Sequence, residues 1–123
     1  MITRAKIIDT AEELGWSCEI EKIKETNPRA GAPYKYYEVR FSEFTTRNQD
    51  VNVELQVESL DDLAGELYQY WQNYDVDEET ALWIGPDGHG QNGAPYHITD
   101  ILKDMEEVEQ DLEDLYKEIN RRY

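Results

Sequence analysis

Side chains that could take part in chemistry are concentrated in two places, an acidic turn near residue 75 and an acidic stretch over residues 104–119. The turn carries Asp75, Asp77 and Glu79 at alternate positions, a spacing that also opens calcium-binding loops. Pro86 stands at the twelfth position of such a loop, where a bidentate glutamate belongs. We therefore interpret the turn as an acidic helix cap rather than a calcium site.

The two histidines lack the neighbours that a zinc or catalytic site needs. His89 and His97 are eight residues apart across a glycine-rich segment, and no HExxH or CxxC motif is present. A zinc site takes three or four protein ligands, and no cysteine or third histidine lies near. We expect no metal, no cofactor and no enzyme activity. The alternative is a weak divalent-metal-dependent hydrolase that uses Asp75, Asp77 and His89.

The acidic stretch, DMEEVEQDLEDLYKEI, contains eight acidic residues and one basic residue, Lys117. Like charges four positions apart on a helix are unfavourable by roughly 0.2–0.5 kcal/mol per pair. Such a surface is either a well-solvated face or a binding site for a basic partner. Carboxylates spaced along a helix can imitate the phosphates of duplex DNA. The residues that we predict to form this partner-binding row are Asp104, Glu107, Asp111, Asp114 and Glu118.

The same helix has a continuous apolar stripe. In a heptad frame that starts at Ile98, every a and d position is apolar, and the e positions Leu102 and Tyr116 widen the stripe. A wide stripe is typical of a helix that packs on its own domain. We expect intramolecular docking, with a helical homo-oligomer, such as a homodimer of structural role, as the alternative.

Net charge limits the classes of partner. The chain has a net charge of −16, and residues 50–120 hold twenty acids against only Lys103 and Lys117. A negative field repels nucleic acid and anionic membranes but attracts a basic protein, including a nucleic-acid-binding protein. No apolar run approaches the ~18–20 residues of a membrane span. The single cysteine, Cys18, cannot form an internal disulfide, which favours a cytoplasmic location.

The elements that must hold these residues follow from hydrophobic periodicity. Residues 3–14 and 59–74 have helical spacing, residues 98–120 form the last helix, and residues 77–85 predict a short helical turn. Three alternating segments predict strands over residues 16–23, 34–44 and 50–58, and segments 27–33 and 85–95 read as loops. We predict one α+β domain over residues 1–123. Its three-stranded antiparallel meander should carry the helices on one face, in the order α-β-β-β-α-(α)-α.

Aromatic residues exceed what one inward sheet face can bury. The chain has nine tyrosines, three tryptophans and two phenylalanines, grouped on one strand and one helix. Some of these rings must therefore lie at the surface, where tyrosine and tryptophan are good interface anchors. We select Tyr36, Tyr68 and Trp71 as candidate aromatic partner contacts.

Residues 48–118 resemble a group of small acidic proteins carried by mobile elements and prophages of Firmicutes. The matching pieces are Gln49-Asp50, the turn Tyr74-Asp75-Val76-Asp77-Glu78, Trp83, and Gly93-Ala94-Pro95. The resemblance implies an accessory protein in a setting where acidic proteins that inhibit restriction or CRISPR defence are common. It transfers no functional residue. Together with the charge it favours a DNA-mimic inhibitor of a nucleic-acid-binding defence protein.

Overall fold

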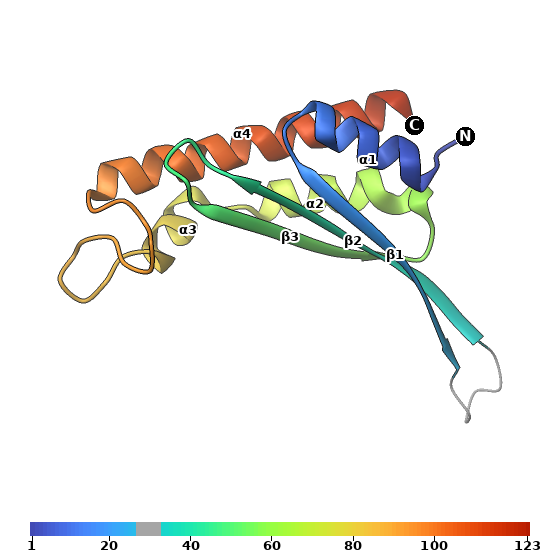
Figure 1. Ribbon diagram of the computed structural model, residues 1–123, viewed down its shortest axis with the longest axis horizontal. Coiled ribbons are helices and arrows are strands. Elements are labelled where there is room, and N and C mark those ends of the chain that lie inside the picture. The colour runs from blue at the N-terminus through green and yellow to red at the C-terminus, as the bar shows by residue number, and fades with distance from the viewer. Residues whose placement is uncertain (27–32) are drawn as a thin grey trace.

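A three-stranded antiparallel sheet, covered on one face by helices, forms the framework of the molecule (Figure 1). The computed structural model describes residues 1–26 and 33–123. Most of the loop predicted at residues 27–33 therefore lies outside the described residues. The elements are α1 (Arg4–Glu13), β1 (Ser17–Thr26), β2 (Pro33–Phe44), β3 (Asp50–Val57), the 3₁₀ turn η1 (Leu60–Asp62), α2 (Leu63–Asn73), α3 (Val76–Leu82) and α4 (Ile98–Arg122). This is the predicted α-β-β-β-α-α-α order.

Helix α1 begins and ends at local signals in the sequence. The side chain of Thr3 accepts a hydrogen bond of 3.2 Å from the backbone N–H of Lys6, which caps the first turn. Gly15 has a φ of 90°, a conformation that favours glycine, and it turns the chain into β1. Between these ends Ile7 and Ala11 are fully buried, so the apolar stripe of α1 faces the core.

The register of the sheet sorts its side chains onto two faces. Cys18 lies opposite Phe41, which in turn lies opposite Val53, and all three are buried on the face that meets the helices. Trp16 packs edge-on against Phe41 with ring centroids 6.4 Å apart. Because side chains alternate along a strand, the residues between these point to the other face.

Two short helices follow β3, and a side chain caps the first turn after each connection. Ser59 accepts a 3.2 Å hydrogen bond from the N–H of Asp61 and starts the η1 turn that leads into α2. Asp75 accepts hydrogen bonds from the N–H groups of Asp77, at 2.9 Å, and Glu78, at 3.1 Å, and starts α3. The interpretation of the acidic turn as a helix cap is thereby confirmed.

Helix α4 docks on its own molecule, as the wide stripe predicts. It packs against α1, α2 and α3, and Figure 1 shows it running along the helix layer. Its stripe is buried from Ile101 onward, whereas Ile98 at the start of the helix is 43% exposed. The buried apolar residues of α4 are Ile101, Met105, Val108, Leu112, Leu115 and Ile119.

Within residues 1–26 and 33–123, no helix lies against the second face of the sheet. Its alternate residues on β3, Asn52, Glu54 and Gln56, are all exposed. Strands β1 and β2 also continue beyond the point where β3 ends: they stay paired as far as Thr26 and Pro33, whereas β3 leaves the sheet after Val57. Figure 1 shows this two-stranded arm projecting past the helices.

Candidate acidic interaction surface

The predicted acidic row begins with a residue that is not on the surface. Asp104 is 0% exposed, so its assignment to an acidic partner-binding surface is wrong. Its carboxylate accepts a 2.7 Å hydrogen bond from the Thr45 hydroxyl and pairs at 3.0 Å with Arg47. Both partners come from the β2–β3 connection. The sequence missed this because Asp104 lies at the border of the apolar stripe, where only the neighbouring turn decides its burial.

Glu107 holds the same connection from one turn further along α4. Its two carboxylate oxygens accept from the backbone N–H of Thr46, at 2.9 Å, and from the Thr46 hydroxyl. Asp104 and Glu107 therefore fasten the β2–β3 turn to α4. These carboxylates act as intramolecular acceptors for hydrogen bonds that the turn would otherwise make to water.

Asp111 is engaged with another carboxyl group. Glu43, the last inward-facing residue of β2, lies beside Asp111, and its Oε1 atom is buried with no hydrogen-bond partner among the described residues. Burial raises the pKa of Glu43 well above its ordinary value, and the neighbouring Asp111 raises it further. Burial also raises the pKa of Asp111. A Glu43 that keeps its proton beside the Asp111 carboxyl group is consistent with the raised pKa of Glu43. An acid in the inward register after Val39 and Phe41 was the sequence signal for this pair.

The last two carboxylates of the row differ in their surroundings. Asp114 is exposed and accepts a 3.0 Å hydrogen bond from Gln110. Glu118 pairs with Arg121 at 2.7 Å and Arg122 at 2.9 Å, and the bond from Arg121 lowers the pKa of Glu118. Arg122 also reaches Glu13 at 2.8 Å, which ties the end of α4 to α1. The five residues thus lie on one helix, but most of them serve the fold.

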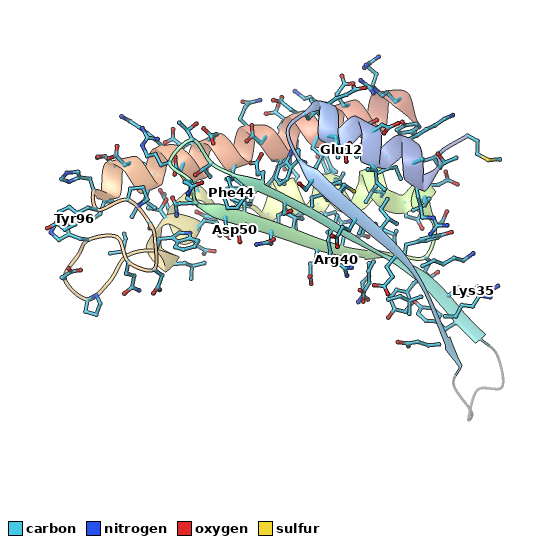
Figure 2. All side chains as sticks on the ribbon, viewed as in Figure 1. Glu12, Lys35, Arg40, Phe44, Asp50 and Tyr96 are labelled. Carbon is cyan, nitrogen blue, oxygen red and sulfur yellow. The ribbon has the colours of Figure 1, made fainter. Side chains whose placement is uncertain are left out.

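A more open acidic surface lies on the helix-free face of the sheet. We call this the sheet face and define it by the outward acids of the three strands and the one arginine among them. Arg40 contacts Glu38 at 3.0 Å, Glu21 at 3.4 Å and Glu19 at 3.6 Å. Figure 2 shows Arg40 and Asp50 on this side of the sheet. The members of the sheet face are Glu19, Glu21, Glu25, Glu38, Arg40, Asp50 and Glu54.

The candidate aromatic contacts fall into two separate groups. Tyr36 lies on the projecting arm, where its hydroxyl donates a 3.1 Å hydrogen bond to Glu25 and its ring is 5.4 Å from that of Tyr34. Tyr68 and Trp71 lie on α2 and meet Tyr116 of α4, with ring centroids 5.2 and 6.0 Å from it. The structure therefore brings Tyr68 and Trp71 together, but not with Tyr36.

The residues of the hydrolase alternative do not converge. The Asp75 carboxylate caps α3, and the His89 ring stacks on Tyr96 with centroids 4.0 Å apart. Over residues 1–26 and 33–123, no three His, Cys, Asp or Glu side chains are grouped to hold a metal ion. In the same described ranges, no helix has the length and apolar character needed to cross a membrane.

Comparison with known proteins adds no relative. No protein-family model, curated protein or solved structure matches the chain. The chemistry of the surfaces described above is therefore what indicates a function.

Proposed function

We propose that this protein is a non-enzymatic interaction module that binds a basic protein through the sheet face. The observation that carries the proposal is the composition of that face, where the described strand residues present six carboxylates and a single guanidinium, that of Arg40. Three glutamates share this one arginine. The face therefore keeps a strong negative potential that a cationic partner can neutralise.

The partner class that fits best is a nucleic-acid-binding protein. Such a protein presents a surface built to neutralise phosphates, and an acidic protein can occupy that surface in place of DNA. The mobile-element and prophage setting implied by the resemblance of residues 48–118 supports the same class. In this form the protein is a DNA-mimic inhibitor, and its phosphate-like carboxylates are those of the sheet face rather than those of α4.

The state of the α4 row supports this change of surface. Asp104, Glu107 and Glu118 already have intramolecular donors or cations, and Asp111 is paired with Glu43. A partner could use them only by breaking contacts that hold the β2–β3 turn and the end of α4.

On the sheet face, Glu19, Glu21 and Glu38 share Arg40, and Glu25 accepts from Tyr36. Among the described residues, the carboxylates of Asp50 and Glu54 make no hydrogen bond or ion pair, and no sheet-face carboxylate fastens the sheet to a helix.

Aromatic side chains border the sheet face and supply apolar contact area. Phe44, at the end of β2, is 68% exposed and lies near Asp50 in Figure 2. Tyr36 borders the opposite end of the same face. Aromatic side chains are enriched at protein interfaces relative to the rest of the surface.

The proposal is tested by capture of basic proteins from a bacterial lysate at about 50 mM and about 500 mM salt. We expect capture of a nucleic-acid-binding protein at low salt and its loss at high salt, because screening weakens contacts between exposed charges. Duplex DNA added to the captured complex should displace the protein. The variant Glu19→Gln, Glu21→Gln, Glu54→Gln should lose capture.

The matched control removes the same charge from the helix layer. It carries Glu12→Gln, Glu106→Gln and Asp114→Asn, three exposed carboxylates on α1 and α4. This control should capture the partner as the wild type does. Equal loss of capture in both variants would show that only net charge matters. Loss of capture in the control alone would show that the partner binds the helix layer instead.

A further inference from the structure

A groove with acidic and aromatic walls lies beside β3, at the end of the sheet face where the arm projects. It has a volume of about 610 Å³ and is open to solvent. This volume is within the range of ligand-binding clefts, roughly 300–1,000 Å³. Residues from the arm, the end of β3 and the start of α2 form it: Tyr34, Tyr36, Glu58, Asp61, Asp62 and Glu66.

The charged side chains of this groove are all acidic in the part of the chain that the structure describes. There its lining includes four carboxylates and no lysine or arginine. In the described parts of the chain, no cation comes within ion-pair distance of Glu58, Asp61, Asp62 or Glu66. Glu58 accepts a 3.2 Å hydrogen bond from the Tyr34 hydroxyl, which fixes one carboxylate against one ring.

The tyrosines give the groove a surface on which a planar cation can lie. The rings of Tyr34 and Tyr36 are 5.4 Å apart and inclined by 35°, and Tyr34 is 48% exposed. A guanidinium stacks on such a ring and donates to carboxylates in its own plane, whereas an ammonium gains less from the ring. This combination of a ring beside Glu58 and three further carboxylates favours arginine over lysine.

The glycine at position 65 is an independent observation in favour of an open groove. It lies in the interior of α2, where glycine is less favourable than alanine, and it lines the groove. A Cβ built on Gly65 would meet nothing within 4 Å, so packing inside the molecule does not require a glycine. A larger residue here would add a side chain to the lining of the groove.

From these features we propose that the groove receives an arginine-bearing basic segment of the partner protein. This rests on the proposed function, since the segment would belong to the same partner that covers the sheet face. The guanidinium lies against Tyr34 and Tyr36 and pairs with Glu58 and Glu66, while Asp61 and Asp62 attract neighbouring cations of the segment.

The test uses the full-length protein and two fluorescent peptides of equal length and charge, one arginine–glycine and one lysine–glycine. Fluorescence anisotropy at about 50 mM salt, where charge contacts are weakly screened, should give tighter binding of the arginine peptide. Tyr34→Leu with Tyr36→Leu should weaken the arginine peptide by about fivefold and remove the preference over lysine. Neither substitution changes the net charge.

Two further variants test separate contributions. One distinguishes the effect of the tyrosine ring from that of its hydroxyl, and the other distinguishes blocking of the groove from loss of stability. Tyr34→Phe loses the hydrogen bond to Glu58 but keeps the ring, so it should bind nearly as the wild type does. Gly65→Gln should weaken binding while its thermal midpoint stays at or above that of the wild type, because glutamine favours a helix more than glycine does.

The outcomes distinguish this inference from the proposed function. Peptide binding that is unchanged by the tyrosine and Gly65 variants but lost in Glu19→Gln, Glu21→Gln, Glu54→Gln would reject the groove and keep the sheet face. Equal affinity for the arginine and lysine peptides would reject arginine recognition. No binding of either peptide to the wild type at low salt would reject the groove, while the capture experiment would still decide the proposed function of the sheet face.

Discussion

The hydroxyl of Thr45 donates a 2.7 Å hydrogen bond to the carboxylate of Asp104, a side chain with no exposed surface. The same carboxylate pairs with Arg47 at 3.0 Å. Two positions 59 residues apart in the chain are thus joined beneath the β2–β3 turn. Asp104, which the sequence predicted to be a surface acid, therefore helps to fasten the β2–β3 turn to α4.

Replacing Asp104 should be among the more damaging single changes in the acidic stretch. In Asp104→Ala, Thr45 loses its acceptor and Arg47 its closest partner, which should lower the free energy of unfolding by about 2–4 kcal/mol. Asp104→Asn keeps an oxygen acceptor for Thr45 and should cost less. Urea denaturation followed by circular dichroism measures both, with Asp114→Ala as the exposed control. A cost for Asp104→Ala that equals that of Asp114→Ala would contradict the buried contact.

The Glu43–Asp111 pair predicts a pH dependence of stability. The pKa of Glu43 is raised from 4.5 to about 9, so the folded protein keeps a proton that the unfolded chain releases above about pH 4.5. A group that binds its proton more tightly in the folded state loses stability as pH rises. The contribution of Glu43 is therefore largest below pH 4.5 and declines up to about pH 9.

Glu43→Gln should remove this decline. The glutamine amide can donate to Asp111 without taking up a proton, so the variant should exceed the wild type at pH 8 by about 1–2 kcal/mol, a value reduced for partial exposure. At pH 4 the two should be nearly equal. Thermal melts across this pH range measure the difference, and Glu54→Gln on the open sheet face should leave the wild-type profile unchanged. A Glu43→Gln profile parallel to that of the wild type would refute the retained proton.

The Cys18 thiol should be unreactive in the folded protein. Burial raises its pKa to about 12, with Glu12 and Glu19 adding to the effect, so almost no thiolate is present at pH 8. Reaction with Ellman's reagent should be slow without denaturant and rapid in urea. Rapid labelling of the native protein would show that β1 opens far more readily than its place in the core suggests.

The docking of α4 predicts that its apolar stripe stabilises a single chain. Leu112 is 1% exposed, and Leu112→Ala should lower the free energy of unfolding by about 2–5 kcal/mol. Leu82, which is 70% exposed, supplies the control, since Leu82→Ala should have little effect. The urea midpoint should not depend on protein concentration. A midpoint that rises with concentration would favour the homo-oligomer alternative, because association stabilises the folded state by mass action.

Local signals predict the fold of this protein well. The strict alternation of Val51, Val53, Leu55 and Val57 fixes both the strand β3 and its inward face. Thr3, Ser59 and Asp75 mark the starts of helical turns because a cap requires only a side-chain oxygen and the next few N–H groups. These interactions are complete within a few residues, so they can be read from the chain without knowing what lies beside it.

The surfaces were less predictable, because exposure depends on segments distant in sequence. Helical periodicity gives the apolar direction of α4, but it cannot tell that the β2–β3 turn covers Asp104, or that Glu43 reaches Asp111. The groove is formed only when the arm, the end of β3 and the start of α2 meet.

The sequence by itself determined the elements, the apolar faces and the excess of negative charge, because each follows from residue type and short-range spacing. Only the tertiary structure decided which carboxylates are fastened inside the molecule and which remain free. Long-range packing brings donors such as Thr45 and Arg47 to some acids of α4, and none of the described helices covers the far side of the sheet.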